Sequence, residues 1–355
     1  MKDQIKAGVK IAAVFASIVL GAGFASGKEI ISFFVNYGMA GYMGLLLSGI
    51  IFAAAGTAVM CTCLREKTKD YNRYMENVAG NKIGGFMEAV LGLFMFAIFA
   101  AMTSAFGASF VESFNLPFTA GIIVSGVLCL LCFLYGMEGI IKLNAFLSPL
   151  MIIGCIFIGL FTFFFKAEGA GTISTSPGEG GPWYASAIIY ASYNIVTAVT
   201  ILSSLKENIK SKTSAVIAGV FGGFLIALIG LCLALTLDVH KELISFYEIP
   251  LLALAKTYGK TIEILFLIVF MTVIFTCAAT NGYAVIRWFS TRFHLKVMPV
   301  SIGITVLACI CAYGGFSNFI NVVYPVFGIV GFLEIILIMR YFIKGKKTVV
   351  QKRKR

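Results

Sequence analysis

The sequence predicts an all-α integral membrane protein with ten transmembrane helices. Hydrophobic residues make up 59% of its 355 positions and charged residues only 12%, and the mean hydropathy is +0.96. Soluble domains carry about 25% charged residues, so this chain has too few polar side chains to cover a water-soluble globule. The composition excludes most soluble enzymes, disordered proteins and secreted disulfide scaffolds.

Ten apolar segments are long enough to cross a bilayer. A spanning helix needs about 20 mostly apolar residues, because every backbone N–H and C=O group must find a partner inside the hydrocarbon. We expect spans at residues 8–37, 41–64, 83–111, 119–135, 143–165, 183–205, 213–237, 260–289, 297–313 and 320–343.

The positive charges set the expected orientation. A net charge of +12 would indicate a nucleic-acid ligand in a soluble protein, but here the Lys and Arg residues lie between the apolar segments. Cytoplasmic loops are enriched in Lys and Arg, and an internal N-terminus leaves only Lys28, Lys166, Lys241, Lys256 and Lys260 outside the cytoplasmic segments. We therefore expect a multi-pass protein of the cell (plasma) membrane with both termini in the cytoplasm. Its partners are the lipid bilayer and a small solute, not nucleic acid.

The nine cysteines and two histidines indicate neither a metal site nor catalysis. Every cysteine lies inside an apolar stretch, where thiols behave as small hydrophobic groups. Cys129 and Cys132 have the spacing of a redox or zinc pair, but no polar ligands accompany them. Because no histidine lies near a nucleophile and no phosphate-binding loop is present, we expect no enzyme activity and no cofactor.

The first span is the best candidate for an interrupted helix. As one continuous helix, residues 8–37 would rise about 45 Å, more than the roughly 30 Å of the hydrocarbon core. Gly21, Gly23 and Gly27 lie in its middle and weaken the helix. Freed backbone groups are tolerated in a membrane only when they line a cavity or bind a ligand; the alternative is a small-residue face for helix packing. Lys28 and Glu29 favour the first interpretation, because ionisable residues inside a span usually face a pathway or each other.

An even number of spans divides into two sets of five with opposite orientations, which is an inverted repeat. Transporters with this plan place their site at the midplane, where the first helix of each half is broken. We expect a first repeat at residues 1–166, an external linker at 167–182, a second repeat at 183–344 and a basic cytoplasmic tail at 345–355 that also meets anionic lipid.

The stretch GAGFASGKEIISFFVNYG at residues 21–38, in a chain of this length with ten spans, resembles the YkvI family of bacterial membrane proteins. That family is placed by similarity near the amino acid, polyamine and organocation transporters with the LeuT-type fold. The resemblance implies a LeuT-like 5+5 inverted repeat in which helices 1 and 6 are discontinuous.

The sixth span, residues 183–205, is then expected to mirror the first. Its polar centre predicts a break within residues 192–197, and a continuous helix with a polar face is the alternative. If both spans are broken, the half-helix that follows Ala25–Gly27 offers N–H groups to a carboxylate, and carbonyl groups or Asn194 offer oxygen to an ammonium group. A zwitterionic amino acid fits this pairing. The predicted substrate-binding residues are Gly21, Ala22, Gly23, Phe24, Ala25, Ser26, Gly27, Tyr193, Asn194 and Thr197.

Two coupling ions are considered. Resemblance to sodium-coupled LeuT-fold proteins implies a Na⁺ site built from the carbonyl groups of Ser17 and Leu20 and the hydroxyl groups of Thr276 and Thr280, unless these threonines only bond back to their own helix. The competing ion is H⁺, carried by Glu29 or Glu334. A carboxyl group shielded from water can cycle between its protonated and ionised forms.

These features predict a secondary active transporter, an ion-coupled symporter of an amino acid or a related small amine that works by alternating access. The stretch 237–259 is expected to form an external interfacial or re-entrant helix. One alternative is a LeuT-fold receptor, similar to germinant-receptor subunits, that binds a ligand without moving it. Another is a passive channel without coupled transport. Nothing in the sequence indicates an oligomeric state.

Overall fold

The computed structural model describes residues 2–66, 68, 70–135, 154, 157, 161, 164, 165, 171 and 182–353, and these residues form helices joined by short turns and loops. Most of the predicted fifth span (143–165) and of the predicted external linker (167–182) lies outside the described residues. The elements are α1 (Lys2–Val19), α2 (Ala22–Ser26), α3 (Lys28–Phe33), η1 (Val35–Tyr37), α4 (Met39–Glu66), α5 (Tyr71–Ala79), α6 (Asn81–Phe114), α7 (Phe118–Tyr135), α9 (Trp183–Ser204), η2 (Leu205–Asn208), α10 (Lys212–Val239), α11 (Lys241–Ile244), α12 (Pro250–Thr257), α13 (Lys260–Phe293), α14 (Val297–Ala312), α15 (Phe316–Asn318), η3 (Phe319–Val323) and α16 (Tyr324–Arg353).

The long helices have the length and composition of membrane spans. Their outer faces expose large aliphatic side chains, such as Ile50 on α4, Leu265 on α13 and Ile329 on α16, each more than 60% exposed. Such a surface is suited to lipid and not to water. Six described helical stretches are long and apolar enough to cross a membrane: Met39–Glu66, Asn81–Phe114, Trp183–Asn208, Lys212–Val239, Lys260–Phe293 and Phe316–Gly345. Two further apolar helices are shorter, namely Phe118–Leu134 and Val297–Ala312. The chain is therefore a multi-pass membrane protein, and all eight stretches coincide with predicted spans. The full count of ten stays a prediction.

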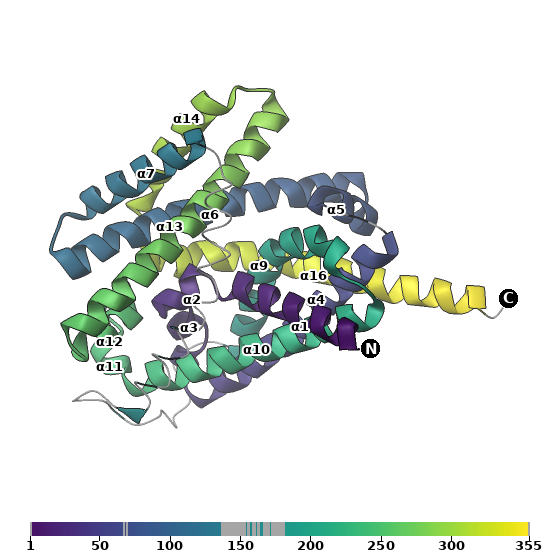
Figure 1. Ribbon diagram of the computed structural model, residues 1–355, viewed down its shortest axis with the longest axis horizontal. Helices are drawn as coiled ribbons and strands as arrows, with labels where there is room; N and C mark the ends of the chain where they lie inside the picture. Colours follow the sequence, from purple (N-terminus) through teal and green to yellow (C-terminus); the bar gives the residue numbers. More distant parts are fainter. Residues whose placement is uncertain are drawn as a thin grey trace.

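The helices form one bundle with both termini at the same end (Figure 1). Helix α5 lies at that end, and α11 and α12 lie at the opposite end. Helices α1 and α4 pack against α10, α6 packs against α13, and α9 packs against α16. Helices α7 and α14 run side by side along one edge. The first span is thereby enclosed by helices from distant parts of the sequence.

The first span consists of three helical pieces. Helix α1 ends at Val19, α2 comprises only Ala22–Ser26, and α3 begins at Lys28. Gly27 ends α2 in the left-handed conformation with φ of 80°, which glycine adopts without the steric cost of a Cβ atom. The chain therefore changes direction twice within the stretch where the sequence concentrates its glycines.

The predicted break in the sixth span is wrong. Helix α9 is one continuous α-helix from Trp183 to Ser204. Its polar side chains bond back to their own helix: the Asn194 amide donates to the carbonyl of Tyr190 at 3.0 Å, and the Thr197 hydroxyl donates to the carbonyl of Asn194 at 2.9 Å. Polar residues of this kind are satisfied inside a helix, and no glycine or proline within α9 forces an interruption.

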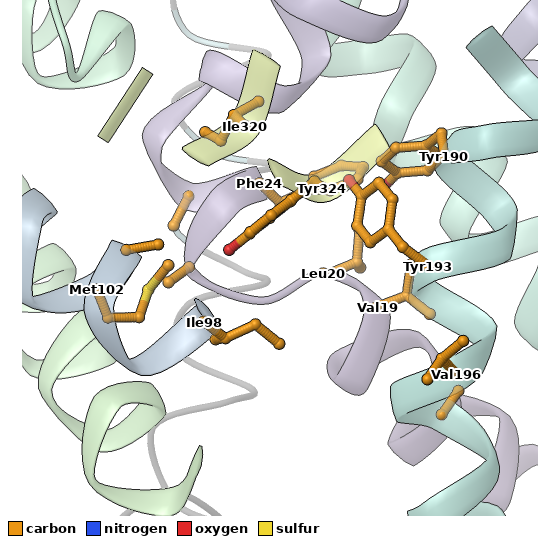
Figure 2. Close-up of a cluster of buried hydrophobic side chains, with 14 of the residues drawn as sticks. Val19, Leu20, Phe24, Ile98, Met102, Tyr190, Tyr193, Val196, Ile320 and Tyr324 are labelled. Atoms are coloured by element: carbon orange, nitrogen blue, oxygen red, sulfur yellow. The ribbon is translucent and has the colours of Figure 1, made fainter. Parts of the chain in front are cut away.

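The last span is irregular instead. It begins as the short helix α15, continues as the π-helical turn η3 and becomes α-helical at Tyr324. Turns of this type occur frequently at functional sites. Here the irregular turn directs Tyr324 towards the centre of the bundle, where it meets the residues of the first span (Figure 2). Helix α16 then runs through most of the predicted tail, as far as Arg353.

Candidate functional site

The interrupted part of the first span lies buried in the centre of the bundle. Every residue of α2 is buried, and Leu20, at the first interruption, is 2% exposed. The side chains that surround this region come from four segments. Figure 2 shows them as Val19, Leu20 and Phe24 from the first span, Ile98 and Met102 from α6, Tyr190, Tyr193 and Val196 from α9, and Ile320 and Tyr324 from the last span. The structure therefore brings the predicted residues of spans 1 and 6 together.

Ser26 fixes the second interruption. Its hydroxyl group donates to the carbonyl of Gly23 at 2.6 Å and accepts from the N–H group of Lys28 at 3.0 Å. One side chain thus satisfies backbone groups on both sides of Gly27, as an N-cap residue does. The Lys28 N–H group, at the start of α3, is therefore already bonded and is not free for a substrate carboxylate.

Glu29 occupies a notch beside Gly23. A Cβ atom placed on Gly23 would lie 1.8 Å from Oε1 of Glu29, so the carboxylate lies directly against the backbone of α2. Glu29 is 5% exposed. The Tyr193 hydroxyl from α9 faces it, and Tyr190 from α9, Cys277 from α13 and Tyr324 from α16 lie within electrostatic range of it. Within the described part of the chain, no Lys, Arg or His forms an ion pair with it.

Three tyrosine rings form the wall next to Glu29. The ring centroids of Tyr190 and Tyr193 are 5.5 Å apart, and those of Tyr193 and Tyr324 are 5.1 Å apart. The Tyr193 hydroxyl faces Glu29 without the geometry of a normal hydrogen bond, and the buried Tyr190 hydroxyl also has no hydrogen-bond partner among the described residues. Buried hydroxyl groups are usually paired, so two such groups at one place indicate a site for a polar ligand.

Sequence reasoning missed several members of this cluster. Tyr190 is not among the predicted binding residues, although its spacing from Tyr193 puts both rings on one face of a helix. Tyr324 and Cys277 carry no local signal, because their position depends on how the last and eighth spans pack. Asn194 and Thr197, which were predicted to bind substrate, direct their donors to their own helix.

The predicted cation ligands lie on two segments that meet. At the end of α1, no hydrogen bond among the described residues reaches the carbonyl oxygens of Ser17 to Leu20, which leaves these oxygens available. The hydroxyl groups of Thr276 and Thr280 donate to the carbonyls of Val273 and Thr276 at 3.0 and 2.7 Å, so only their lone pairs remain for an ion. Cys277 lies between these threonines in sequence, and the N–H group of Ala22 points at its sulfur atom. The start of α2 and the middle of α13 are therefore in contact.

Polar contacts close the end of the bundle that holds α11 and α12. The ammonium group of Lys28 donates to the carbonyl of Tyr247 at 3.0 Å. The Glu248 carboxylate accepts hydrogen bonds from the N–H and hydroxyl groups of Ser317, both at 2.7 Å, and the Glu248 N–H group donates to the Glu112 carboxylate at 2.9 Å. The segment predicted as an interfacial or re-entrant helix thus joins α3, α6 and α15, and we call these contacts the polar latch.

Glu334, the other predicted proton carrier, makes its contacts away from this cluster. Glu334 on α16 is fully buried, and its Oε2 atom accepts a long hydrogen bond of 3.4 Å from the Tyr71 hydroxyl on α5. Its Oε1 atom has no partner among the described residues. A separate pocket of about 530 Å³, lined by Asn72, Glu88 and Arg287 among others, opens between α5, α6 and α13 and contains none of the predicted site residues.

This arrangement of helices is the LeuT-type fold found in secondary transporters. The chain superposes on MhsT in complex with L-phenylalanine with a TM-score of 0.63 (14% identity, 92% of this chain and 87% of that chain). It also superposes on the Eremococcus coleocola manganese transporter with a TM-score of 0.62 (14% identity, 97% and 86%) and on inward-facing Mhp1 with a TM-score of 0.57 (14% identity, 91% and 73%).

Among curated sequences, the chain is similar to two proteins of Bacillus subtilis (strain 168). It is 25% identical to the uncharacterized membrane protein YkvI over 321 residues, which cover 90% of this chain and 92% of that protein. It is 24% identical to the uncharacterized protein YyaD over 341 residues, which cover 96% and 98%. No family model matches the chain. The predicted resemblance to YkvI-type proteins and the predicted LeuT-type fold are confirmed.

Proposed function

We propose that the protein is a secondary active transporter that carries an amino acid or a related small amine by ion-coupled symport. The observation that supports this most directly is the interruption of the first span beside the unpaired hydroxyl groups of Tyr190 and Tyr193. Interrupted helices at membrane depth are tolerated where the freed backbone binds a ligand or lines a cavity. In this proposal the interruption and the tyrosines form the solute site.

Alternating access would then use the two joints of the first span. Helix α1 can tilt at Leu20–Gly21 to open the site towards the end that holds the termini. Release of the polar latch, which joins α3 to Tyr247 and Glu248 to Ser317, would open it towards the other end. Movements of this kind around a fixed site are the usual mechanism of inverted-repeat transporters.

The topology that accompanies this mechanism is part of the proposal. The first repeat comprises residues 1–166 and the second residues 183–344, in a plasma membrane with both termini in the cytoplasm. The position of both termini at one end of the bundle supports an even number of crossings. Arg65 lies in the last turn of α4 and Arg292 in the last turn of α13, and the orientation rule would place these helix ends in the cytoplasm.

Two coupling ions remain candidates within the proposal. Sodium would bind the carbonyl oxygens of Ser17 and Leu20 and the hydroxyl groups of Thr276 and Thr280, and the carbonyls without hydrogen bonds at the end of α1 favour it. A proton would bind Glu29 or Glu334. Under this second scheme, Glu29→Gln abolishes uptake that is driven by a pH gradient, and unchanged uptake eliminates Glu29 as the proton carrier.

Uptake into proteoliposomes tests the proposal. The purified protein is offered a panel of radiolabelled amino acids and amines while Na⁺ and pH gradients are imposed separately. Accumulation that depends on one gradient and saturates with solute is the expected result. Saturable binding without accumulation would indicate a receptor, and flux that ignores both gradients and does not saturate would indicate a channel.

A further inference from the structure

The central site contains a buried carboxyl group that has no cationic partner among the described residues. Glu29 is buried, and in the described part of the chain it has neither an ion-pair partner nor a backbone N–H donor. A buried carboxylate normally has a cation or several donors beside it, because its desolvation is costly. The N-terminus of α3 gives it limited support, since that helix has only six residues.

The sequence provides a place for this carboxylate. Gly23 leaves the notch in which Oε1 of Glu29 lies, and any larger residue at position 23 would fill it. The Ser26 hydroxyl group donates to the carbonyl of Gly23 and not to the carboxyl group of Glu29. The local structure thus holds the carboxyl group of Glu29 beside the aromatic cluster without supplying a hydrogen bond from Ser26.

The groups around Glu29 suit a positively charged ligand. The Tyr193 hydroxyl faces the carboxyl group, and the rings of Tyr190 and Tyr324 lie beside that of Tyr193. Phe33 lies 5.6 Å from both Tyr190 and Tyr193 between ring centroids. Aromatic faces attract ammonium groups, most strongly where water is excluded. The hydroxyl oxygens of Tyr190 and Tyr193, which have no hydrogen-bond partner among the described residues, can accept hydrogen bonds from the N–H groups of such a ligand.

The same site offers little to a carboxylate. Lys28 follows the interruption directly, but its ammonium group points to the carbonyl of Tyr247 in the polar latch. Its backbone N–H group is already bonded to Ser26. An anionic group of the solute would therefore meet Glu29 without a compensating charge.

We propose that the transported solute is a small organic amine, held by its ammonium group between Glu29 and the rings of Tyr190, Tyr193 and Tyr324. This inference rests on the proposed function and narrows its substrate class from amino acids and amines to amines that lack a free carboxylate. Glu29 then acts as the counter-ion of the solute, and coupling by Na⁺ remains compatible with this role.

Matched ligands test the charge preference on the wild-type protein. Binding is measured in nanodiscs by thermal stabilisation and by titration, with isobutylamine, valine and isovalerate as one set and putrescine and ornithine as another. Each amine differs from its amino acid by one carboxylate. The amines are expected to bind at least tenfold more tightly than the corresponding amino acids, and isovalerate is expected not to bind.

Variants then test the residues. Glu29→Gln is expected to weaken amine binding at least tenfold, and Tyr193→Phe to weaken it by a smaller factor. Glu263→Gln is the matched control, because Glu263 is a buried acid paired with Lys260 outside this site, and its amine binding should equal that of the wild type. If Glu29→Gln does not fold, Tyr193→Phe and the ligand sets on the wild-type protein decide the matter.

The outcomes separate this inference from the proposed function. Equal binding of amines and amino acids, or wild-type amine binding by Glu29→Gln, overturns the inference, while gradient-driven uptake of a zwitterion would leave the transport function standing. Conversely, Glu29-dependent amine binding without accumulation under any gradient supports the site and contradicts transport.

Discussion

The side chain of Glu29 fills the space that the missing side chain of Gly23 leaves in the core. A methyl group on Gly23 would lie 1.8 Å from the Glu29 Oε1 atom. This contact couples the conformation of α2 to the position of the acidic side chain on α3. It also means that the smallest possible substitution in the central motif should be sufficient to displace the charged group.

Gly23→Ala should destabilise the protein and weaken solute binding. Overpacking a buried site costs about 1–3 kcal/mol, and the displaced carboxylate leaves the tyrosine cluster. Thermal unfolding and solute binding in nanodiscs would measure both effects. The matched control is Gly85→Ala on α6, where an added Cβ meets nothing within 4 Å and helix propensity predicts stabilisation of about 0.5–1 kcal/mol. Equal effects of the two substitutions would contradict the contact.

Gly27→Ala should destabilise the interruption in two ways. A left-handed alanine costs about 1–2 kcal/mol, and its Cβ atom would lie 2.9 Å from Cγ of Leu251. A double-mutant cycle with Leu251→Ala separates these contributions, because only the steric part is relieved when Leu251 is truncated. Denaturation of the four proteins should give a coupling energy of at least about 0.5 kcal/mol, and additivity would show that Leu251 does not confine Gly27.

Ser26→Ala should loosen the joint between α2 and α3. The substitution removes both hydrogen bonds of the hydroxyl group, which together stabilise the fold by about 1–2 kcal/mol. Hydrogen exchange should become faster at Gly27–Ile31. Ser204→Ala is the control, since the Ser204 hydroxyl also bonds a carbonyl but lies at an exposed position. Unchanged exchange at the joint would contradict the bridging role of Ser26.

Glu248→Gln should weaken the polar latch. The Glu248 carboxylate accepts two hydrogen bonds from Ser317, and hydrogen bonds to a charged group contribute about 1.5–3 kcal/mol. We expect faster hydrogen exchange at residues 247–250 and 315–319, because the segment before α12 separates from α15 more often. The exposed Glu242, in the same segment, provides the control variant Glu242→Gln. If both variants exchange like the wild type, the latch does not hold this end closed.

Glu334→Gln should increase thermal stability. The Glu334 carboxylate is fully buried, with one long hydrogen bond and one oxygen atom that has no partner among the described residues. A buried carboxyl group with an unpaired oxygen atom carries a desolvation cost, and the neutral amide is expected to reduce that cost. Thermal unfolding of Glu334→Gln measures the change in stability. Tyr71→Phe, which removes only the hydroxyl donor, is measured beside it. A lower unfolding temperature for Glu334→Gln would show that the ionised group is structurally required, and a stable variant without pH-driven uptake would identify it as a proton carrier.

The positions of the spans could be predicted from the composition of the sequence. Whether each span is continuous or interrupted could be predicted only in part. Apolar segments separated by charges located the helices α4, α6, α7, α9, α10, α13, α14 and α16, because a chain segment that crosses the hydrocarbon needs about 20 mostly apolar residues. Glycine propensity placed the irregular region of the first span between Leu20 and Gly27 because the backbone conformation there requires the absence of a Cβ atom. These signals are local, and a single sequence contains them.

The errors concern interactions between distant segments. The polar centre of α9 does not interrupt the helix, because the side chains of Asn194 and Thr197 donate hydrogen bonds to carbonyl groups of their own helix. The π-helical turn at Phe319–Val323 and the approach of Tyr324 to Tyr193 depend on the packing of α16 against α9, which no local pattern encodes. The notch for Glu29 could likewise be recognised only after α2 and α3 had been placed in space.

Leu237 of α10 and Leu251 of α12 close around Gly27, with a Cβ position there only 3.2 and 2.9 Å from their side-chain atoms. The bend in the N-terminal segment is therefore packed against residues more than two hundred positions further along the chain. An N-terminal fragment that ends before α9 would lack Leu237 and Leu251. The bend is therefore expected to form only when the complementary C-terminal fragment is present in the same bilayer. Reassembly from two separately encoded polypeptides would then report directly on how the bend is made.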